Sequence, residues 1–350
     1  MSARSALDAL AEALVTEGVA PTVALGFARK EGSLWRTYTG GDRARIFDLA
    51  SLTKPMTAVA LQRTGLRAEP LGELLEEARG TKIERAPLEL ALAHRIGLDA
   101  HVPLFLRDLL EPRAALEIVA RSTRAGCDGV LPNGGHPPLY SDLGYILAGV
   151  ALARHAGVVD AGAAIDRLVV APLSLEEELG TAREFTAKIG AAFHERVVPT
   201  ETVAWRGGTV RGVVHDENAW VLTKDGGSGH AGMFGTIEGV LRFATHVLDE
   251  RERYAWLIER RPGGTLRAGF DGKSAEGSSA GSLLSNDAFG HLGFTGTSFW
   301  IDPDAEIVVS LLTNRVHPRR DNARIKEARP RTHDALFALA REKGASEPTF

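Results

Sequence analysis

The most constraining feature of this sequence is that its strand-like segments lie near the two ends of the chain, with a long helical stretch between them. Two runs of β-prone residues, 22–28 and 33–39, flank a Lys-Glu-Gly turn and predict an antiparallel hairpin. Three more runs, at 289–294, 297–301 and 307–312, are separated by turn residues and predict strands close to the other end. We expect both sets to contribute to one sheet domain, with the middle of the chain inserted between them.

The remaining segments are predicted to be mostly helical. The apolar residues at positions 7, 10, 11, 14 and 15 recur with the spacing of an amphipathic helix. Further helices are expected at 51–65, over most of 68–199 apart from loops at 97–103 and 126–138, near 237–249, and after the capping pair Asp321-Asn322. The predicted class is α+β, an antiparallel sheet flanked by helices plus an inserted all-helical region. The expected domains are a discontinuous sheet domain, 1–66 and 205–350, and a mostly helical domain, 67–204.

Composition excludes several classes of protein. With 44% hydrophobic and 25% charged residues, these 350 residues have the composition of an ordinary globular chain. A net charge of −4 gives no field that favours nucleic acid or an anionic membrane, so neither partner is expected. Acidic residues interrupt the N-terminal segment, and the longest uncharged stretch, 288–301, is too short for a membrane span. These features predict a cytoplasmic protein, with its single cysteine, Cys127, as a buried thiol.

A serine and a lysine three residues apart, Ser51 and Lys54, stand where an extended run changes into a helix. If Ser51 begins the helix, Lys54 lies on the same face one turn later. The unpaired amides and the positive end of the helix dipole would favour a developing alkoxide on Ser51. A desolvated lysine beside it could accept the hydroxyl proton. Taken alone, however, this spacing is more often an ordinary helix start than a nucleophile.

Further segments follow this pair in a recognisable order. The segment 48–58 contains Ser51 and Lys54, and it is followed by 92–98, by Tyr140-Ser141-Asp142, by 229–234 and by 290–294, which includes His291-x-Gly293. Together they resemble the serine β-lactamase and penicillin-binding-protein superfamily, specifically its class C-like branch. The resemblance extends from residue 22 to about residue 317. It implies the β-lactamase/transpeptidase-like fold, with a site between the sheet and the helical region.

The resemblance also implies roles for particular residues. Ser51 would be the acylated nucleophile, Lys54 its proton acceptor or the group that tunes Tyr140, and Tyr140 the general base and then acid. The backbone amides of Ser51 and Phe294 would form the oxyanion hole. Asp142, His291 and Gly293 would line the substrate pocket.

Three departures from the family pattern affect the expected substrate. Asp142 replaces an Asn, and a carboxylate beside Lys54 favours the ammonium form and weakens the lysine as a base. His291 and Leu292 replace Lys and Thr, which removes a fixed positive charge suited to a substrate carboxylate. We therefore expect a small-molecule ester or amide substrate, with a carboxylesterase favoured. The alternatives are a D-amino-acid peptidase or D,D-carboxypeptidase, a weak β-lactamase, and a catalytically inactive binding protein on the same scaffold.

The histidines of the sequence suggest a second hypothesis, a metal hydrolase. His215 and Asp216, together with His230 or His194, could bind zinc, but their spacing fits no compact ligand pattern. No metal or cofactor is expected. The Gly- and Ser-rich segment 261–289 is predicted to be a long irregular loop, of a kind that often forms a lid or rim.

Overall fold

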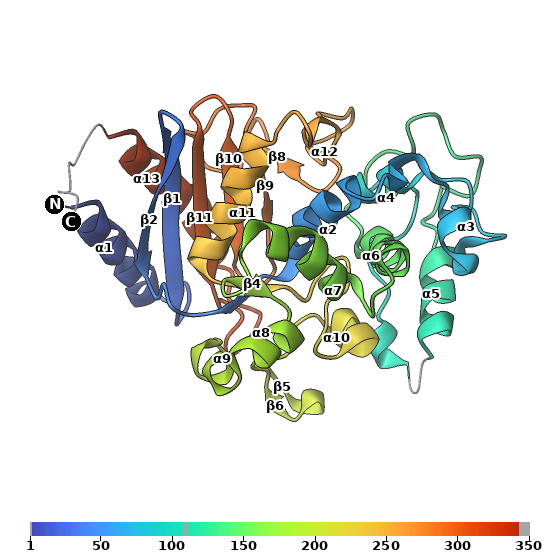
Figure 1. Cartoon of the computed structure of the whole chain (residues 1–350), viewed down its shortest axis with the longest axis horizontal. Coiled ribbons are helices and arrows are strands. Elements are labelled where there is room, and N and C mark those ends of the chain that lie inside the picture. The colour runs from blue at the N-terminus through green and yellow to red at the C-terminus, as the bar shows by residue number, and fades with distance from the viewer. Residues whose placement is uncertain (1, 108–110, 343–350) are drawn as a thin grey trace.

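The computed structural model describes residues 2–107 and 111–342, and its centre is a six-stranded antiparallel sheet in the order β2-β1-β11-β10-β9-β8 (Figure 1). The first two strands come from the N-terminal part of the chain and the other four from the C-terminal part, which confirms the predicted assembly from both ends. The bounds of these strands are β1 Val23–Glu31, β2 Leu34–Gly41, β8 Asp271–Gly272, β9 Phe289–Leu292, β10 Ser298–Asp302 and β11 Ile307–Thr313.

Helices cover both faces of this sheet. In the register between β1 and β11, Val23 is opposite Thr313, and side chains point alternately to the two faces, as the period of a strand requires. Leu25 and Val309 point into a core shared with α1 (Ala3–Thr16) and α13 (Ile325–Arg341). Ala28 and Val308 point into the other core, which contains α11 (Ile237–Asp249). The sheet therefore lies between α1 and α13 on one side and α11 on the other (Figure 1).

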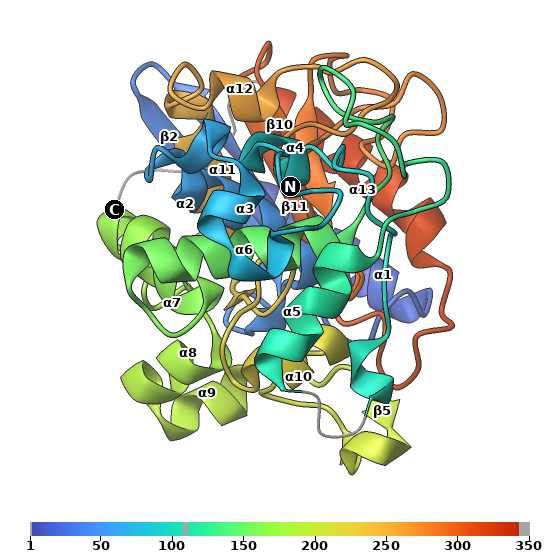
Figure 2. The same cartoon turned by 90° about the vertical axis from the view of Figure 1, so that its right-hand side faces the viewer.

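The middle of the chain is mostly helical, as predicted. Its longest helix, α6 (Asp142–Ala156), is buried over most of its length and ends at Gly157, which has the left-handed φ of +65° typical of a helix C-terminus. Several of the surrounding helices face the viewer in Figure 2. The remaining helices are α2 Thr53–Gln62, α3 Leu71–Leu74, α4 Leu88–Leu92, α5 Pro112–Arg121, α7 Ala161–Ile165, α8 Ala182–Ile189, α9 Ala191–Arg196, α10 Glu217–Thr223 and α12 Ala255–Ile258.

A small three-stranded sheet joins the helical region to the rest of the molecule. It has the order β3-β7-β4, with β3 at Phe47–Asp48, β7 at Phe234–Gly235 and β4 at Leu179–Gly180. A separate hairpin pairs β5 (Thr202–Val203) with β6 (Gly208–Thr209). Helix α2 follows β3 and packs against α6 and α7. The start of α2 therefore lies where the two regions meet, and the domain boundaries at 66–67 and 204–205 stay a prediction.

Several local features differ from the sequence-based expectation or refine it. The last helix begins at Ile325, with Arg324 as its N-cap residue. Asn322 donates its side-chain amide to the carbonyls of Gly18 and Val19, and its side-chain oxygen accepts from the Arg324 amide at 3.2 Å. The strand expected at 289–294 ends at Leu292. Segment 261–289 is mostly irregular, with β8 and the first residue of β9 as its only named strands among the described residues. Cys127 is buried and unpaired. None of the helices in the described ranges has the length and apolar character that crossing a membrane requires.

Candidate active site

Ser51 lies in a single 3-10 turn, Ala50–Leu52, that leads directly into α2. Ala50 has a φ of +48°, a left-handed conformation that costs a residue with a Cβ roughly 1–2 kcal/mol. The buried Asp48 carboxylate holds this turn by accepting from the Ala50 amide at 2.8 Å and from the His215 amide at 2.6 Å. Strain that the surroundings maintain at one residue is a frequent property of functional sites.

The connection between β9 and β10 holds the same turn from the other side. Thr295 Oγ1 donates to the Asp48 carbonyl at 2.8 Å, and Thr297 Oγ1 donates to the Leu49 carbonyl at 3.0 Å. Gly293 allows this close approach, because a Cβ there would lie 2.7 Å from the Leu49 carbonyl oxygen and 2.0 Å from Thr297 Oγ1. The edge of the sheet and the Ser51 turn therefore have a fixed position relative to each other.

Lys54 lies directly behind Ser51 and is fully buried. Its Nζ donates to Ser51 Oγ at 2.9 Å, to Asp142 Oδ1 at 2.7 Å and to the His230 carbonyl at 3.4 Å. Burial alone would lower the pKa of Lys54, but the charge of Asp142 and the nearby Tyr140 outweigh it, so the pKa is raised. The lysine is therefore an ammonium with all three N–H bonds engaged, and it has no lone pair to accept a proton. The contact between Lys54 and Asp142 is the one from which the sequence analysis expected Lys54 to be a weaker base.

Tyr140 completes the cluster. Its ring lies 4.7 Å from Lys54 Nζ, stacks on His94 at 4.8 Å and is tilted against His291 at 6.0 Å. Burial raises the pKa of Tyr140, while the positive charge of Lys54 acts in the opposite direction. Burial and the same ammonium lower the pKa of both His94 and His291 to about 3, so both rings are neutral at pH 7. His94 accepts the Ser141 amide on Nδ1 at 3.0 Å, which places its proton on Nε2.

These residues open into a cavity of about 520 Å³, here called the Ser51 pocket. The side chains that line it include Ser51, Tyr140 and Asp142 on one side, and Gly293, Phe294 and three arginines, Arg315, Arg320 and Arg329, on the other. Arg320 pairs with Glu201 and Glu217. Within the described residues, Arg315 and Arg329 donate to backbone carbonyl oxygens alone, those of Phe294, Arg320, Asn322, Gly293 and Thr297.

Phe294 lies at the mouth of the pocket, where its side chain packs between two neighbouring side chains. Its side chain is 48% exposed and lies between the Arg315 guanidinium, 4.7 Å from the ring, and the His215 ring at 5.7 Å. Its carbonyl accepts from Arg315 Nε at 2.9 Å. These contacts fix the peptide unit that follows Gly293.

The four residues considered as zinc ligands have other partners or lie elsewhere. His215 Nε2 contacts Glu201 at 3.1 Å, and His230 Nε2 contacts Asp216 at 2.9 Å. His194 lies exposed on α9. Across residues 2–107 and 111–342, no group of three His, Cys, Asp or Glu side chains is arranged to hold a metal ion.

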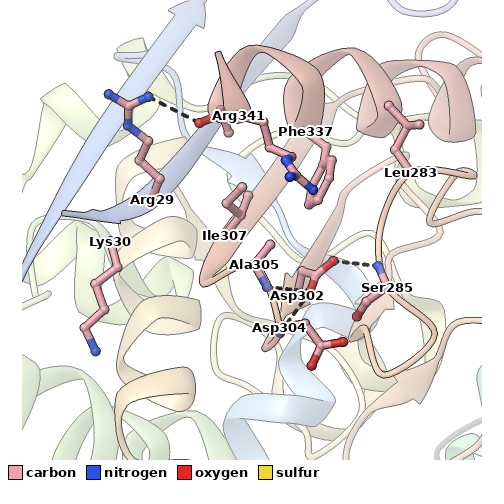
Figure 3. Close-up of a pocket in the computed structure, with 11 residues that line it drawn as sticks. Arg29, Lys30, Leu283, Ser285, Asp302, Asp304, Ala305, Ile307, Phe337 and Arg341 are labelled. Atoms are coloured by element: carbon pink, nitrogen blue, oxygen red, sulfur yellow. Dashed lines mark hydrogen bonds between the residues drawn. The ribbon is translucent and has the colours of Figure 1, made fainter. Parts of the chain in front are cut away.

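A second cavity, of about 380 Å³, lies between β1, the turn after β10 and α13 (Figure 3). Its most buried acid, Asp302, accepts from the amides of Ser285, Asp304 and Ala305 and so stabilises a turn. Arg29 donates to the carbonyls of Ala340 and Glu342. These groups have structural partners, and the cavity lacks a serine–lysine pair like that of the Ser51 pocket.

All the residues predicted for the site are brought together in and around the Ser51 pocket: Ser51, Lys54, Tyr140, Asp142, His291, Gly293 and Phe294. Sequence reasoning missed His101, which lines the pocket 3.9 Å from Asp142, and the arginines of the opposite side. Arg315 lies two residues after the end of β11, and its amide donates to the Thr295 carbonyl at 3.0 Å, a contact that no local sequence pattern indicates. Only the strand pairing shows that these segments meet.

An antiparallel sheet built from both chain ends, with a serine–lysine turn at its edge and a helical region beside it, defines the β-lactamase/transpeptidase fold. Residues 7–332 match the Beta-lactamase family, and the chain belongs to that family.

Relatives and solved structures agree with this assignment. A putative D-alanyl-D-alanine carboxypeptidase of Salmonella gallinarum is 31% identical over 133 residues, 34% of this chain and 31% of that protein. The chain matches its first two curated relatives over less than half of their own length. A class C beta lactamase from Rhodobacter sphaeroides superposes with a TM-score of 0.67 at 18% identity, covering 96% of this chain and 99% of that one. EstCE1, a hydrolase with promiscuous acyltransferase activity, gives 0.64 at 19% identity, covering 93% and 97%.

Proposed function

We propose that this protein is a serine hydrolase that cleaves a small ester through an acyl-enzyme on Ser51, and that it is a carboxylesterase. The observation that carries the proposal is the 2.9 Å contact between Ser51 Oγ and the buried Lys54 ammonium at the base of an open pocket. A structural serine at a helix start needs no buried cation behind it, since burying a charge is costly unless it is paired. The resemblance in fold to EstCE1 supports an esterase.

The proposed mechanism assigns the base role to Tyr140. Because burial raises the pKa of Tyr140, a small fraction of the protein carries the phenolate at pH 7. In that fraction the phenolate, stabilised by Lys54, takes the proton of Ser51 Oγ as the oxygen attacks the ester carbonyl. The amides of Ser51 and Phe294 stabilise the oxyanion, and each such donor contributes about 3 kcal/mol. Tyr140 then returns the proton to the departing alcohol. Water hydrolyses the acyl-enzyme by the same steps, with Tyr140 taking the proton of the water and returning it to Ser51.

Other residues hold this arrangement. Asp142 keeps Lys54 charged and in place, and Gly293 allows the Phe294 amide to approach the Ser51 turn. His291 lies next to Tyr140 as a neutral ring, so it offers an incoming substrate a hydrogen bond and no charge. A neutral acyl group has no charge to pair with a lysine, so the replacement of the family lysine by His291 should not weaken its binding.

One observation favours a second candidate, a D-amino-acid peptidase or D,D-carboxypeptidase. Arg315 and Arg329 line the Ser51 pocket with carbonyl oxygens as their hydrogen-bond partners, and a substrate carboxylate could pair with them. These positive charges occupy a different place from the lysine that His291 replaces. Comparing a short-chain ester with a D-amino-acid dipeptide by kcat/KM separates the two candidates. A higher value for the dipeptide would reject the esterase.

The test of the serine mechanism is intact mass after treatment with a fluorophosphonate. We expect one adduct on the native protein, mapped to Ser51, and none on Ser51→Ala, which should also lose about 10⁴-fold or more in kcat. Ser228→Ala is the matched control, because Ser228 is a buried serine that contacts His230 and not Lys54. It should still be labelled. A folded native protein that forms no adduct and turns over no ester would support the binding protein instead.

A further inference from the structure

A third cavity, of about 490 Å³, lies between two loops, and it is here called the Arg95 pocket. One loop, 133–138, comes shortly before Tyr140, and the other is 259–263. Arg95 joins them, since its guanidinium donates to the Pro262 carbonyl and its own carbonyl accepts from the His136 amide at 2.8 Å. Its neighbour His94 is the ring that stacks on Tyr140. The Arg95 pocket is therefore adjacent to the Ser51 pocket but has different lining residues.

The charges of the Arg95 pocket are unbalanced. Arg95, Arg260 and Arg261 line it, with the exposed Glu259 as the one acid among the lining residues. Arg260 pairs with Asp287 at 2.8 Å, outside the pocket lining. Arg261 has a carboxylate oxygen of Glu89 at 3.9 Å, but that carboxylate is already held by Arg67 at 2.6 Å. The hydrogen-bond partner of the Arg95 guanidinium within the described residues is a carbonyl oxygen.

Two of these guanidinium groups also have unused donors. Arg95 is only 6% exposed, and the Arg261 side chain is 14% exposed. The Nε atoms of both are buried and have no hydrogen-bond partner among the residues that the structure describes. An unsatisfied buried donor on a charged group is costly, and two such cations close together repel each other. An oxyanion in the pocket would offset this repulsion by pairing with the guanidinium groups that line it, since guanidinium binds carboxylate and phosphate oxygens in pairs.

We propose that the Arg95 pocket is a binding site for a small oxyanion, a carboxylate or phosphate group, separate from the Ser51 pocket. Arg95 and Arg261 supply the donors, and Arg260 adds positive charge at the side. The glycine- and proline-rich loops leave room for the ligand, because few side chains fill the space between them.

The test is calorimetric titration of the full chain with sodium phosphate and, in a second arm, sodium acetate, at constant ionic strength set with sodium chloride. We expect saturable binding of at least one of the two anions, and the arm that binds identifies phosphate or carboxylate as the ligand class. Arg261→Gln should raise the dissociation constant about 10- to 100-fold, the usual effect of losing a charged hydrogen-bond partner. Arg95→Met should act in the same direction, and Arg261→Gln keeps the test valid if Arg95→Met does not fold.

Arg315→Gln is the matched control, because Arg315 is a guanidinium in the Ser51 pocket with carbonyl partners. It should leave the anion affinity unchanged, and so should Ser51→Ala, so that failure of the serine mechanism and failure of this site are distinguishable. Absence of saturable binding in both arms overturns the proposal. Binding that Arg315→Gln abolishes and Arg261→Gln retains also overturns it, since the anion would then occupy the Ser51 pocket.

Discussion

The Ser51 pocket has two walls that differ in how their charges are compensated. One, the paired wall, consists of Lys54, Tyr140, Asp142 and His101, and here each charged group has an opposite charge beside it. The other, the arginine wall, consists of Gly293, Phe294, Arg315 and Arg329, and its two cations contact carbonyl oxygens. The charges of the paired wall are therefore compensated without a ligand, whereas the arginine wall keeps positive charge that a ligand can pair with.

The largest expected effect comes from breaking the paired wall. Asp142→Ala leaves the Lys54 ammonium buried and unpaired, which should lower the free energy of unfolding by about 3–5 kcal/mol. Urea unfolding at pH 7 measures it. Asp142→Asn keeps a hydrogen-bond acceptor and should cost less, while the lost negative charge lowers the pKa of Lys54 and Tyr140 and moves the pH–rate profile to lower pH. An unchanged profile would show that Asp142 does not control the base.

The next effect concerns the arginine wall and is expected in binding. Arg315→Gln should raise KM for a substrate that carries a carboxylate about 10- to 100-fold and leave KM for a neutral ester unchanged. Steady-state kinetics on a matched pair of such substrates measures the effect. An equal loss of kcat on both substrates would mean that Arg315 acts by positioning Phe294, whose carbonyl it holds.

Acid pH should weaken the Tyr140 side of the pocket through its neutral histidines. The folded pKa of His291 is about 3, below its unfolded value of about 6.5, so the unfolded state binds more protons between these values and stability falls as pH falls. The slope is at most about 1.4 kcal/mol per pH unit for this residue. His291→Gln should therefore recover about 1.6 kcal/mol of the stability lost between pH 6.5 and 5, since the slope is half its maximum at pH 6.5. Urea unfolding at both pH values tests this, and identical pH slopes for both proteins would contradict it.

The smallest effect is expected at His101, at the exposed end of the paired wall. The Asp142 carboxylate, 3.9 Å away, raises the pKa of His101, whose side chain is 43% exposed. His101→Gln should change the unfolding free energy by less than about 1 kcal/mol, as is usual for exposed ion pairs. An NMR titration should show the His101 pKa above its ordinary value and its return toward that value in Asp142→Asn. No difference between the two proteins would mean that the paired wall ends at Asp142.

Apart from His101, the paired wall could be predicted from the sequence far better than the arginine wall. Ser51 and Lys54 are one helical turn apart, so local geometry alone places them together, and the consequence of Asp142 for Lys54 followed once Tyr140-Ser141-Asp142 was identified. The same is true of the sheet, whose strands are predicted as short β-prone runs separated by turn residues. Arg315 and Arg329 follow from strand and helix packing across the chain, which no local pattern reports. The neutral-substrate argument considered only positions 142, 291 and 292 and therefore missed these arginines.

The pairing of β1 with β11 has a consequence for how the protein reaches its native state. Val23 cannot meet Thr313, and Leu49 cannot meet Thr297, until both ends of a very long loop have come together. Closing such loops has a high entropic cost, and chains dominated by distant contacts fold slowly. During synthesis, the Ser51 turn therefore has no contact with the segment 295–297 or with β11 until the residues near 313 have emerged from the ribosome. The proposed hydrolase activity should therefore appear as one of the last events of folding, after most of the helical region has formed.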